Sequence, residues 1–484
     1  MKAFMETCFR KDPAMSAVNR SINQMNLIRF CESVPKFTLC FSSSIRMVHN
    51  TAMEKVLDVA GIIDNGKFIP GGFSIELENG SINSINRQNA SGKWKNCIAV
   101  PGLIQTHVHL GQTLFRGMAE GKSLLPWLEN RIWPFEASHT PDTLAVSVIQ
   151  SLRELFSSGC TGLLDMGVLR HSEVSVDILR RSGARALIGN SLMDVGPDWI
   201  TEELSWLAEE TERVKNSCGD HVTYAYTPRF ALSCSDSLWE WMALLPAGVK
   251  RTTHASESQD EINHPTLRES LGNVHFLQSK GFTGPDTLLA HCIHLQDGEM
   301  QILRESGTTA VHCPWTNLRL GSGIADIPAM CNGNIRVTVA SDGAACNNRL
   351  DLAGDLRLAM GLASIVKSAA AIDSKFWFNS ASHSAASALG WKSTGRIAKS
   401  FAADITLIKP SDEEWEELEL SEDPVRYILE LTWPERVVLT MVAGRTVYQN
   451  GEFPTLPSLP MRVNEARRII LDRASRIPGN PLFK

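Results

Sequence analysis

The sequence contains no apolar run approaching the roughly 18 residues needed to cross a bilayer, so no membrane-spanning helix is expected. It also lacks a long basic stripe, and its net charge of −6 argues against nucleic acid or an anionic membrane as a partner. Internal repeats and low-complexity tracts are absent too. We therefore expect a soluble protein.

The eleven cysteines include no CxxC pair. A secreted disulfide framework would show an even count and tighter spacing, so we expect free thiols in a reducing, cytoplasmic compartment. The chain of 484 residues is 43% hydrophobic and 21% charged, which is typical of a soluble globular protein with a large core. This length allows roughly two to four domains, although one α/β barrel can account for much of it.

The segment 101–110 reads Pro-Gly-Leu-Ile-Gln-Thr-His-Val-His-Leu and contains two histidines spaced i and i+2. Alternate side chains of a strand share a face, so His107 and His109 can bind one ion. Taken alone, the pair is equally consistent with one surface histidine and one packed core histidine. The metal hypothesis therefore depends on other residues.

Three further polar groups, His254, His291 and Asp342, each stand where a short strand gives way to a loop. Parallel barrels keep their catalytic groups at such strand ends, which favours one shared metal site. Helical segments separate the strands, and this alternation predicts an α/β fold, a (β/α)8 TIM barrel. Seven strand candidates follow the one that ends at His109: residues 160–166, 185–189, 222–228, 249–253, 287–292, 308–313 and 336–340.

Short β-like runs broken by turn signals occur towards both ends of the chain, at residues 54–96 and 403–451. Neither patch can form a core alone, so we expect them to meet in one small composite β-sandwich. The first 52 residues carry seven Lys or Arg against three acids; they read as a targeting segment or, as we prefer, a poorly ordered extension. The expected domains are the N-terminal extension (1–52), the sandwich (53–100 and 393–455), the barrel (101–392) and a C-terminal helical tail (456–484).

These motifs resemble the amidohydrolase superfamily, and within it the nucleobase and nucleoside deaminases together with the s-triazine hydrolases. The resemblance extends over about residues 54–455. Three imidazoles and a carboxylate suit Zn²⁺ or Fe²⁺. Binuclear members carry a bridging modified Lys on strand four, but residues 222–230 contain no Lys, so we expect one divalent metal, Zn²⁺ in preference to Fe²⁺. The ligands that the resemblance implies are His107, His109, His254 and Asp342.

The deaminases of this group keep their proton shuttle three residues after the strand-five histidine, where this chain has Glu257. With His291 and Asp342 it would form the catalytic set: a metal-activated water attacks an amidine-like ring carbon, and Glu257 moves the proton that lets ammonia leave. The alternative interpretation of Glu257 is a solvated loop acid, which is what we expect of Asp260 and Glu261.

The same resemblance implies substrate-binding residues. In deaminases of 5′-substituted adenosines, the counterpart of Glu136 binds the ribose hydroxyls, and the counterpart of Trp127 lines the base pocket. Those enzymes commonly carry a His after the strand-four Pro, whereas this chain has Arg229 and Phe230, as guanine deaminase does. An Arg fork suits a carbonyl acceptor, and Gln112 would assist it. Each of these side chains could instead serve packing, solvent contact or a structural ion pair.

The leading hypothesis is a hydrolytic deaminase of a purine nucleoside of the 5′-substituted adenosine class. The alternatives are a guanine deaminase and an s-triazine amino- or chlorohydrolase. A non-catalytic binding homologue is a remote alternative, because neither a ligand nor the shuttle is lost. The expected partners are a small heterocyclic substrate and, by family resemblance only, further copies of the chain in a dimer or tetramer.

Overall fold

The computed structural model describes residues 54–368, 371–430 and 433–478, which belong to one compact unit, Asn50–Lys484. The predicted extension 1–52 lies outside the described residues. Within them, every helix is too short or too polar to cross a membrane. The eight cysteines of the described part are free thiols.

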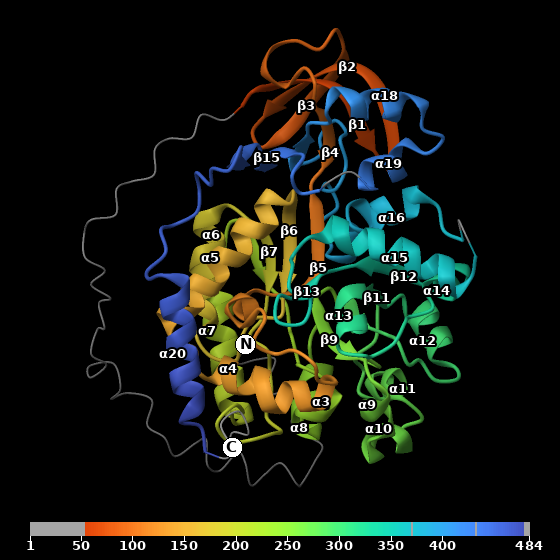
Figure 1. Cartoon of the computed structure of the whole chain (residues 1–484). Helices are drawn as coiled ribbons and strands as arrows, with labels where there is room; N and C mark the ends of the chain where they lie inside the picture. The colour runs from red at the N-terminus through yellow and green to blue at the C-terminus, as the bar shows by residue number, and fades with distance from the viewer. Residues whose placement is uncertain (1–53, 369–370, 431–432, 479–484) are drawn as a thin grey trace, which may run out of the picture. The chain divides into compact units, whose positions relative to one another are not determined.

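Both ends of the described chain contribute to one seven-stranded sheet (Figure 1). Its strands are β1 (Val56–Asp64), β2 (Lys67–Glu78), β3 (Ser81–Arg87), β4 (Ile98–Pro101), β14 (Ile405–Ile408), β15 (Val437–Val442) and β16 (Arg445–Gln449). The order is β16-β15-β14-β4-β1-β2-β3, and β4 runs parallel to β1 while every other neighbouring pair is antiparallel. Leu57 and Val59 from one end share an apolar core with Leu407 and Leu439 from the other. The two predicted β patches therefore meet.

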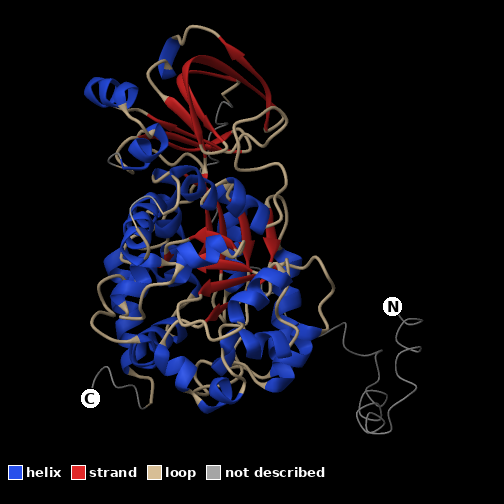
Figure 2. Cartoon of the chain, turned by 90° about the vertical axis from the view of Figure 1, so that its right-hand side faces the viewer, coloured by secondary structure: helices blue, strands red, loops and turns tan. Residues whose placement is uncertain are grey.

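Two parallel sheets carry the candidate functional residues, and helices surround them (Figure 2). Their strands are β5 (Leu103–His109), β6 (Cys160–Asp165), β7 (Arg185–Ile188), β8 (Val222–Tyr224), β9 (Arg251–Ala255), β10 (Thr287–His291), β11 (Thr309–His312), β12 (Arg336–Val339) and β13 (Asp342–Gly343). One sheet has the order β13-β5-β6-β7-β8 and the other β12-β11-β10-β9. Each of the seven later strand predictions overlaps an observed strand.

The two parallel sheets are connected at both edges. Parallel bridges pair Tyr226 with Arg251 and Phe230 with His254, which joins the β8 side to β9. At the other edge, β12 and β13 follow one another directly along the chain. One apolar cluster takes residues from strands of both sheets and from α17: Ile104, Leu164, Leu187, Leu288, Val311 and Ala385. Strands of both sheets therefore face a common interior.

Helices alternate with the parallel strands as their amphipathic periodicity predicts. They are α5 (Pro141–Ser157), α6 (Ser172–Ser182), α7 (Leu204–Ser217), α8 (Asp236–Ala243), α12 (Glu299–Ser306), α13 (Pro314–Arg319), α14 (Ile327–Asn332), α15 (Leu352–Val366), α16 (Ser374–Ser380) and α17 (His383–Ala388). The longest, α5, is capped by Thr140, which precedes its first residue and whose hydroxyl accepts a hydrogen bond from the Thr143 amide. Helix α12 ends at Gly307, which adopts a left-handed conformation with φ 71°.

Shorter helices build the segments around the strand ends. They are η2 (Gly92–Trp94), η3 (Leu110–Phe115), α3 (Leu124–Trp127), η4 (Leu128–Ile132), α4 (Trp133–Ala137), η5 (Ala231–Ser233), α9 (Gln259–Asn263), α10 (Pro265–Glu269) and α11 (Asn273–Ser279). The segment between β9 and β10 forms three helices, α9, α10 and α11. Pro265 has no amide proton with which to continue α9, and Gly272 (φ 133°) separates α10 from α11.

The C-terminal tail contains the predicted amphipathic helix, α20 (Val463–Ser475). Its buried residues Ala466 and Ile470 pack in one cluster with Phe115 and Ile132. The remaining helices, α18 (Asp412–Leu420) and α19 (Pro424–Glu430), lie between β14 and β15 along the chain. The tail helix is thus packed on the segments that follow β5.

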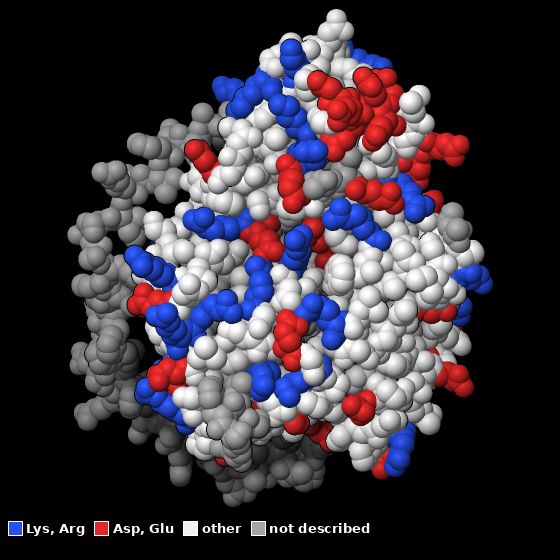
Figure 3. Space-filling view, viewed as in Figure 1, with Lys and Arg blue, Asp and Glu red and all other residues white. Residues whose placement is uncertain are grey.

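Charged side chains of both signs are interspersed over the face shown in Figure 3. The densest group of acids on this face lies over α18. Its exposed members are Asp412, Glu413, Glu416, Glu417 and Glu419.

Replacing Gly102 by alanine is expected to lower the free energy of unfolding by about 1–3 kcal/mol. Gly102 separates β4 from β5, and an added methyl group would meet Cγ2 of Thr161 at 2.1 Å and its Oγ1 at 2.3 Å. Urea unfolding measures the change. The matched control is Gly361→Ala, because Gly361 is exposed on α15 and a methyl group there has open space. The control is expected to gain up to about 1 kcal/mol, and equal losses in both variants would contradict the argument.

Candidate metal centre and active site

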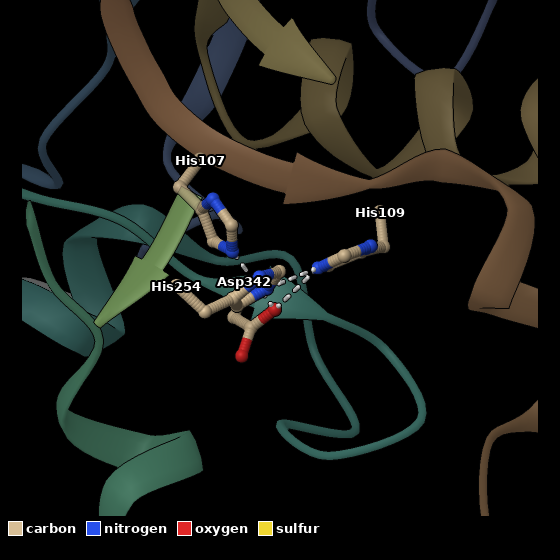
Figure 4. A group of neighbouring side chains, drawn as sticks. All are labelled: His107, His109, His254 and Asp342. Carbon is tan, nitrogen blue, oxygen red and sulfur yellow. Dashed lines mark hydrogen bonds and ion pairs between the residues drawn. The ribbon is translucent and has the colours of Figure 1, made fainter. Parts of the chain in front are cut away.

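Four side chains from three strand ends converge on one point (Figure 4). His107 and His109 come from the end of β5, His254 from β9 and Asp342 from β13. Their ligand atoms all lie within 4.8 Å of one another. His107, His109 and Asp342 are no more than 4% exposed. The structure thus brings together the four residues that the sequence predicted as a ligand set.

The spacing of these atoms fits a single small cation. A tetrahedral ion with bonds of about 2.0–2.1 Å places its ligand atoms about 3.3–3.4 Å apart. The observed separations are 3.2 Å between Nε2 of His109 and Nε2 of His254, 3.3 Å between Nε2 of His109 and Oδ1 of Asp342, and 3.5 Å between Nε2 of His107 and the same oxygen. Nε2 of His107 is buried and has no hydrogen-bond partner among the described residues. The donor set therefore suits a metal better than it suits a hydrogen-bonded cluster.

Neighbouring groups hold two of these ligands in place. Nδ1 of His254 lies 2.5 Å from the carbonyl oxygen of Arg229, which accepts its proton and leaves Nε2 free to bind an ion. Oδ1 of Asp342 accepts a hydrogen bond of 2.7 Å from the Gly343 amide. Asp342 has a φ of 61° and His291 a φ of 75°, which are strained values for residues other than glycine. Such strain is characteristic of functional sites.

The pKa values of three of these residues are shifted in the direction that metal binding favours. Burial lowers the pKa of His109 and His254 well below the ordinary histidine value. Burial alone would raise the pKa of Asp342, but the neighbouring His107, His109 and His291 hold it well below its usual range. These shifts favour the neutral form of the two imidazoles and the ionised form of the carboxylate.

Beside the cluster, Glu257 and His291 face each other. Oε2 of Glu257 lies 3.3 Å from Nε2 of His291, which is 4.0 Å from Oδ2 of Asp342. Burial lowers the pKa of His291 to about 4, and its Nδ1 donates a hydrogen bond of 2.9 Å to Oδ1 of Asn317. Burial, Asp342 and Glu261 raise the pKa of Glu257 well above its usual value. A carboxyl group with a raised pKa can both accept and return a proton near neutral pH.

One cavity contains these groups together with most of the predicted substrate-binding residues. Its lining residues include Gln112, Trp127, Arg229 and Phe230. Glu136 contacts two of them: Oε1 accepts a hydrogen bond of 2.9 Å from Nε2 of Gln112, and Oε2 lies 2.5 Å from Nη1 of Arg229. Gly343 makes room for Gln112, because a methyl group at this glycine would lie 2.1 Å from Oε1 of Gln112.

Comparison with known proteins shows to which family the chain belongs. The sequence model of the amidohydrolase family matches residues 98–447. The 5-methylthioadenosine/S-adenosylhomocysteine deaminase of Bacillus cytotoxicus is 30% identical over 386 residues, which are 78% of this chain and 86% of that protein. The protein of the same name from Bacillus cereus is 31% identical over 75% of this chain and 84% of its own length. The chain belongs to the amidohydrolase family.

Solved structures share the fold of this amidohydrolase. An adenosine deaminase from Xanthomonas campestris with bound zinc matches 87% of this chain and 98% of its own, with a TM-score of 0.77 and 21% identity. Guanine deaminase from C. acetobutylicum with bound guanine covers 81% of this chain and 100% of its own, with a TM-score of 0.73 and 24% identity. Atrazine chlorohydrolase from Arthrobacter aurescens with zinc covers 87% of this chain and 99% of its own, with a TM-score of 0.72 and 20% identity. The resemblance inferred from the sequence motifs is confirmed.

Two buried groups of this amidohydrolase were missed or misjudged from its sequence. We expected Glu261 to be a solvated loop acid like Asp260, and this was wrong: Asp260 is exposed, but Glu261 is 1% exposed and lines the cavity. Asn317, which contacts His291, was assigned no role. A capping pattern, Ser258 followed by Glu261, was the one local signal that could have indicated a fixed position for this acid.

Proposed function

We propose that this amidohydrolase is a metal-dependent deaminase of a purine nucleoside of the 5′-substituted adenosine class. The observation that carries the proposal is the pairing of Glu257 with His291 beside four metal-type ligands, three of which line the same cavity as this pair. The names of the relatives that are about 30% identical support the substrate class. The reaction replaces the exocyclic amino group by a ring carbonyl and releases ammonia.

One divalent ion would be held by His107, His109, His254 and Asp342. When bound, such an ion supplies a Lewis acid that lowers the pKa of a water molecule towards 7. Zn²⁺ suits three imidazoles and one carboxylate, and Fe²⁺ is the alternative. The zinc in the deaminase from Xanthomonas campestris supports this choice.

Glu257 would transfer the protons. Its carboxylate takes a proton from the attacking water and delivers it to a ring nitrogen, which makes the amino-bearing carbon electrophilic. Glu257 then moves the second proton of the added water, from the hydroxyl group on the ring carbon to the amino group, so that a carbonyl forms and ammonia leaves. His291 and Asp342 flank this position, and we assign them the orientation of the water and the stabilisation of charge in the transition state.

The remaining cavity residues, together with Glu136 behind Gln112 and Arg229, would select the substrate. Trp127 and Phe230 are apolar walls that suit a purine ring. Gln112 and Arg229 supply donors, and Glu136 would bind ribose hydroxyls in a nucleoside. A second candidate, guanine deaminase, is favoured by one observation: Arg229 lines the cavity while its charge is balanced by Glu136, so its other donors can face a ring carbonyl. An s-triazine hydrolase is a third, supported by fold alone.

The fold that presents this site would be a (β/α)8 barrel over residues 101–392. The two connected parallel sheets and their common interior cluster support it. The seven-stranded sheet would form the small composite sandwich of residues 53–100 and 393–455, because its strands surround a core of their own. Residues 456–484 would add the helical tail.

Ammonia release from a substrate panel tests the proposed function. We expect zinc-loaded protein to deaminate 5′-methylthioadenosine, S-adenosylhomocysteine and 5′-deoxyadenosine, and protein stripped by a chelator to be inactive until Zn²⁺ or Fe²⁺ is restored. Guanine, cytosine and a chlorotriazine complete the panel. Turnover of guanine alone would move the assignment to guanine deaminase, and turnover of the chlorotriazine alone to the triazine hydrolases. Activity that survives chelation would contradict the metal assignment.

A further inference from the structure

Glu261 is a buried acid close to the proposed proton shuttle but separate from it. It lies on α9, whose first turn is capped by Ser258: the Glu261 amide donates a hydrogen bond of 3.2 Å to Oγ of Ser258. The Glu261 side chain is 1% exposed and reaches the cavity. Since buried acids are rare unless their oxygens are paired, the partners of this carboxylate indicate what it does.

Both carboxylate oxygens of Glu261 accept hydrogen bonds. Oε2 accepts from the backbone amide of Glu257 at 2.9 Å, and Oε1 accepts from Nδ2 of Asn273 at 2.8 Å. Asn273 is fully buried at the start of α11. The carboxylate therefore ties the backbone of Glu257 to a packed helix.

The backbone that Glu261 holds is under strain. Strand β9 ends at Ala255, and the next residue, Ser256, has a φ of 53°. The carbonyl oxygen of Ser256 accepts hydrogen bonds of 2.9 Å from the amides of Ile293 and His294. This turn directs the side chain of Glu257 towards His291. The backbone amide of Glu257, which follows Ser256 directly, is the group that donates to Glu261. Without that bond, the buried amide of Glu257 would lose this acceptor.

We propose that Glu261 is a positioning residue that fixes the backbone of Glu257 so that its carboxylate faces His291. The inference rests on the proposed function, because it assigns the proton shuttle to Glu257. The role assigned to Glu261 requires no contact with the substrate or with the ligand cluster. Glu261 acts through a bond between its own side chain and one backbone amide.

The test compares Glu261→Gln with Asp260→Asn. Both replace a carboxylate by an amide, but Asp260 is exposed and lies one residue away from the buried acid. A glutamine is neutral and has only one side-chain oxygen, so the hydrogen bond that it can offer the Glu257 amide is weaker than the charge-assisted bond from the carboxylate. The two variants therefore make the same chemical change, but only Glu261→Gln alters the hydrogen bond to the Glu257 amide.

Hydrogen–deuterium exchange of a peptide covering residues 256–258 in zinc-loaded protein is the first measurement. Glu261→Gln is expected to raise exchange at the Glu257 amide about fivefold or more, with no change in Asp260→Asn. The second measurement is steady-state kinetics, where Glu261→Gln is expected to lower kcat about 10- to 100-fold and leave KM nearly unchanged. Thermal melting confirms that each variant is folded.

Equal exchange at the Glu257 amide in Glu261→Gln, Asp260→Asn and the unmodified protein would overturn the proposal, whatever happens to kcat. If Glu261→Gln fails to fold, Glu261→Asp replaces it: the shorter side chain keeps the charge but withdraws the carboxylate from the Glu257 amide, and unchanged exchange would again overturn the proposal. Absence of turnover in the unmodified protein would count against the proposed function, while the exchange measurement still decides the role of Glu261.

Discussion

Replacing Glu257 by glutamine is expected to lower kcat by about a hundred- to ten-thousand-fold, because a glutamine side chain cannot accept and return a proton near neutral pH. Its size and hydrogen-bonding shape are retained. Bound metal should stay at the level of the unmodified protein, since the four clustered ligands do not include Glu257. Kinetics on the best substrate and metal analysis by mass spectrometry measure both quantities.

The contrasting variant is His254→Ala, which removes a ligand atom from the cluster. It is expected to lose both metal and turnover, whereas Glu257→Gln loses turnover alone. A glutamine variant with kcat within about tenfold of the unmodified protein would show that another group moves the proton. Loss of metal in the glutamine variant would instead place Glu257 among the ligands.

The second large effect is expected from the ion pair between Glu136 and Arg229. Their side chains are only 6% and 5% exposed, and two guanidinium nitrogens approach the carboxylate. Replacing Glu136 by leucine leaves a buried cation without a partner and should lower the free energy of unfolding by about 3–5 kcal/mol. Urea unfolding of zinc-saturated protein measures the loss.

A double-mutant cycle shows whether this loss belongs to the pair. Glu136→Leu combined with Arg229→Leu should recover most of the stability, because no charge is then left buried and unpaired. The control is Asp177→Ala, which breaks an exposed pair with Arg181 and should change the free energy of unfolding by less than about 1 kcal/mol. If the losses of the two leucine variants simply add, the pair contributes no coupling.

The convergence of His107, His109, His254 and Asp342 could be predicted because its signals are local. His107 and His109 are separated by one residue on a strand, so their shared face follows from the pleat. His254 and Asp342 each follow a short apolar run, and parallel strands bring such ends together. The strand pattern and the family resemblance were therefore enough to predict that these four side chains converge.

The surroundings of the cluster could not be predicted in the same way. Glu136 and Arg229 are 93 residues apart, and nothing near either residue indicates its partner. Asp260 and Glu261 are adjacent acids on a five-residue helix, too short for periodicity to show which one turns inwards. Likewise, the two β patches were expected to meet, but the parallel pairing of β4 with β1 depends on contacts across the whole chain.

Arg229 contacts the ligand cluster through its backbone and the cavity through its side chain. Its carbonyl oxygen accepts a hydrogen bond from the ring of His254, whereas its side chain lines the cavity. Every amino acid has the carbonyl, so a change of side chain at this position leaves this acceptor for the proposed metal ligand in place. Under the proposed function, substrate preference can therefore diverge here during evolution while the hydrolytic chemistry is inherited unchanged.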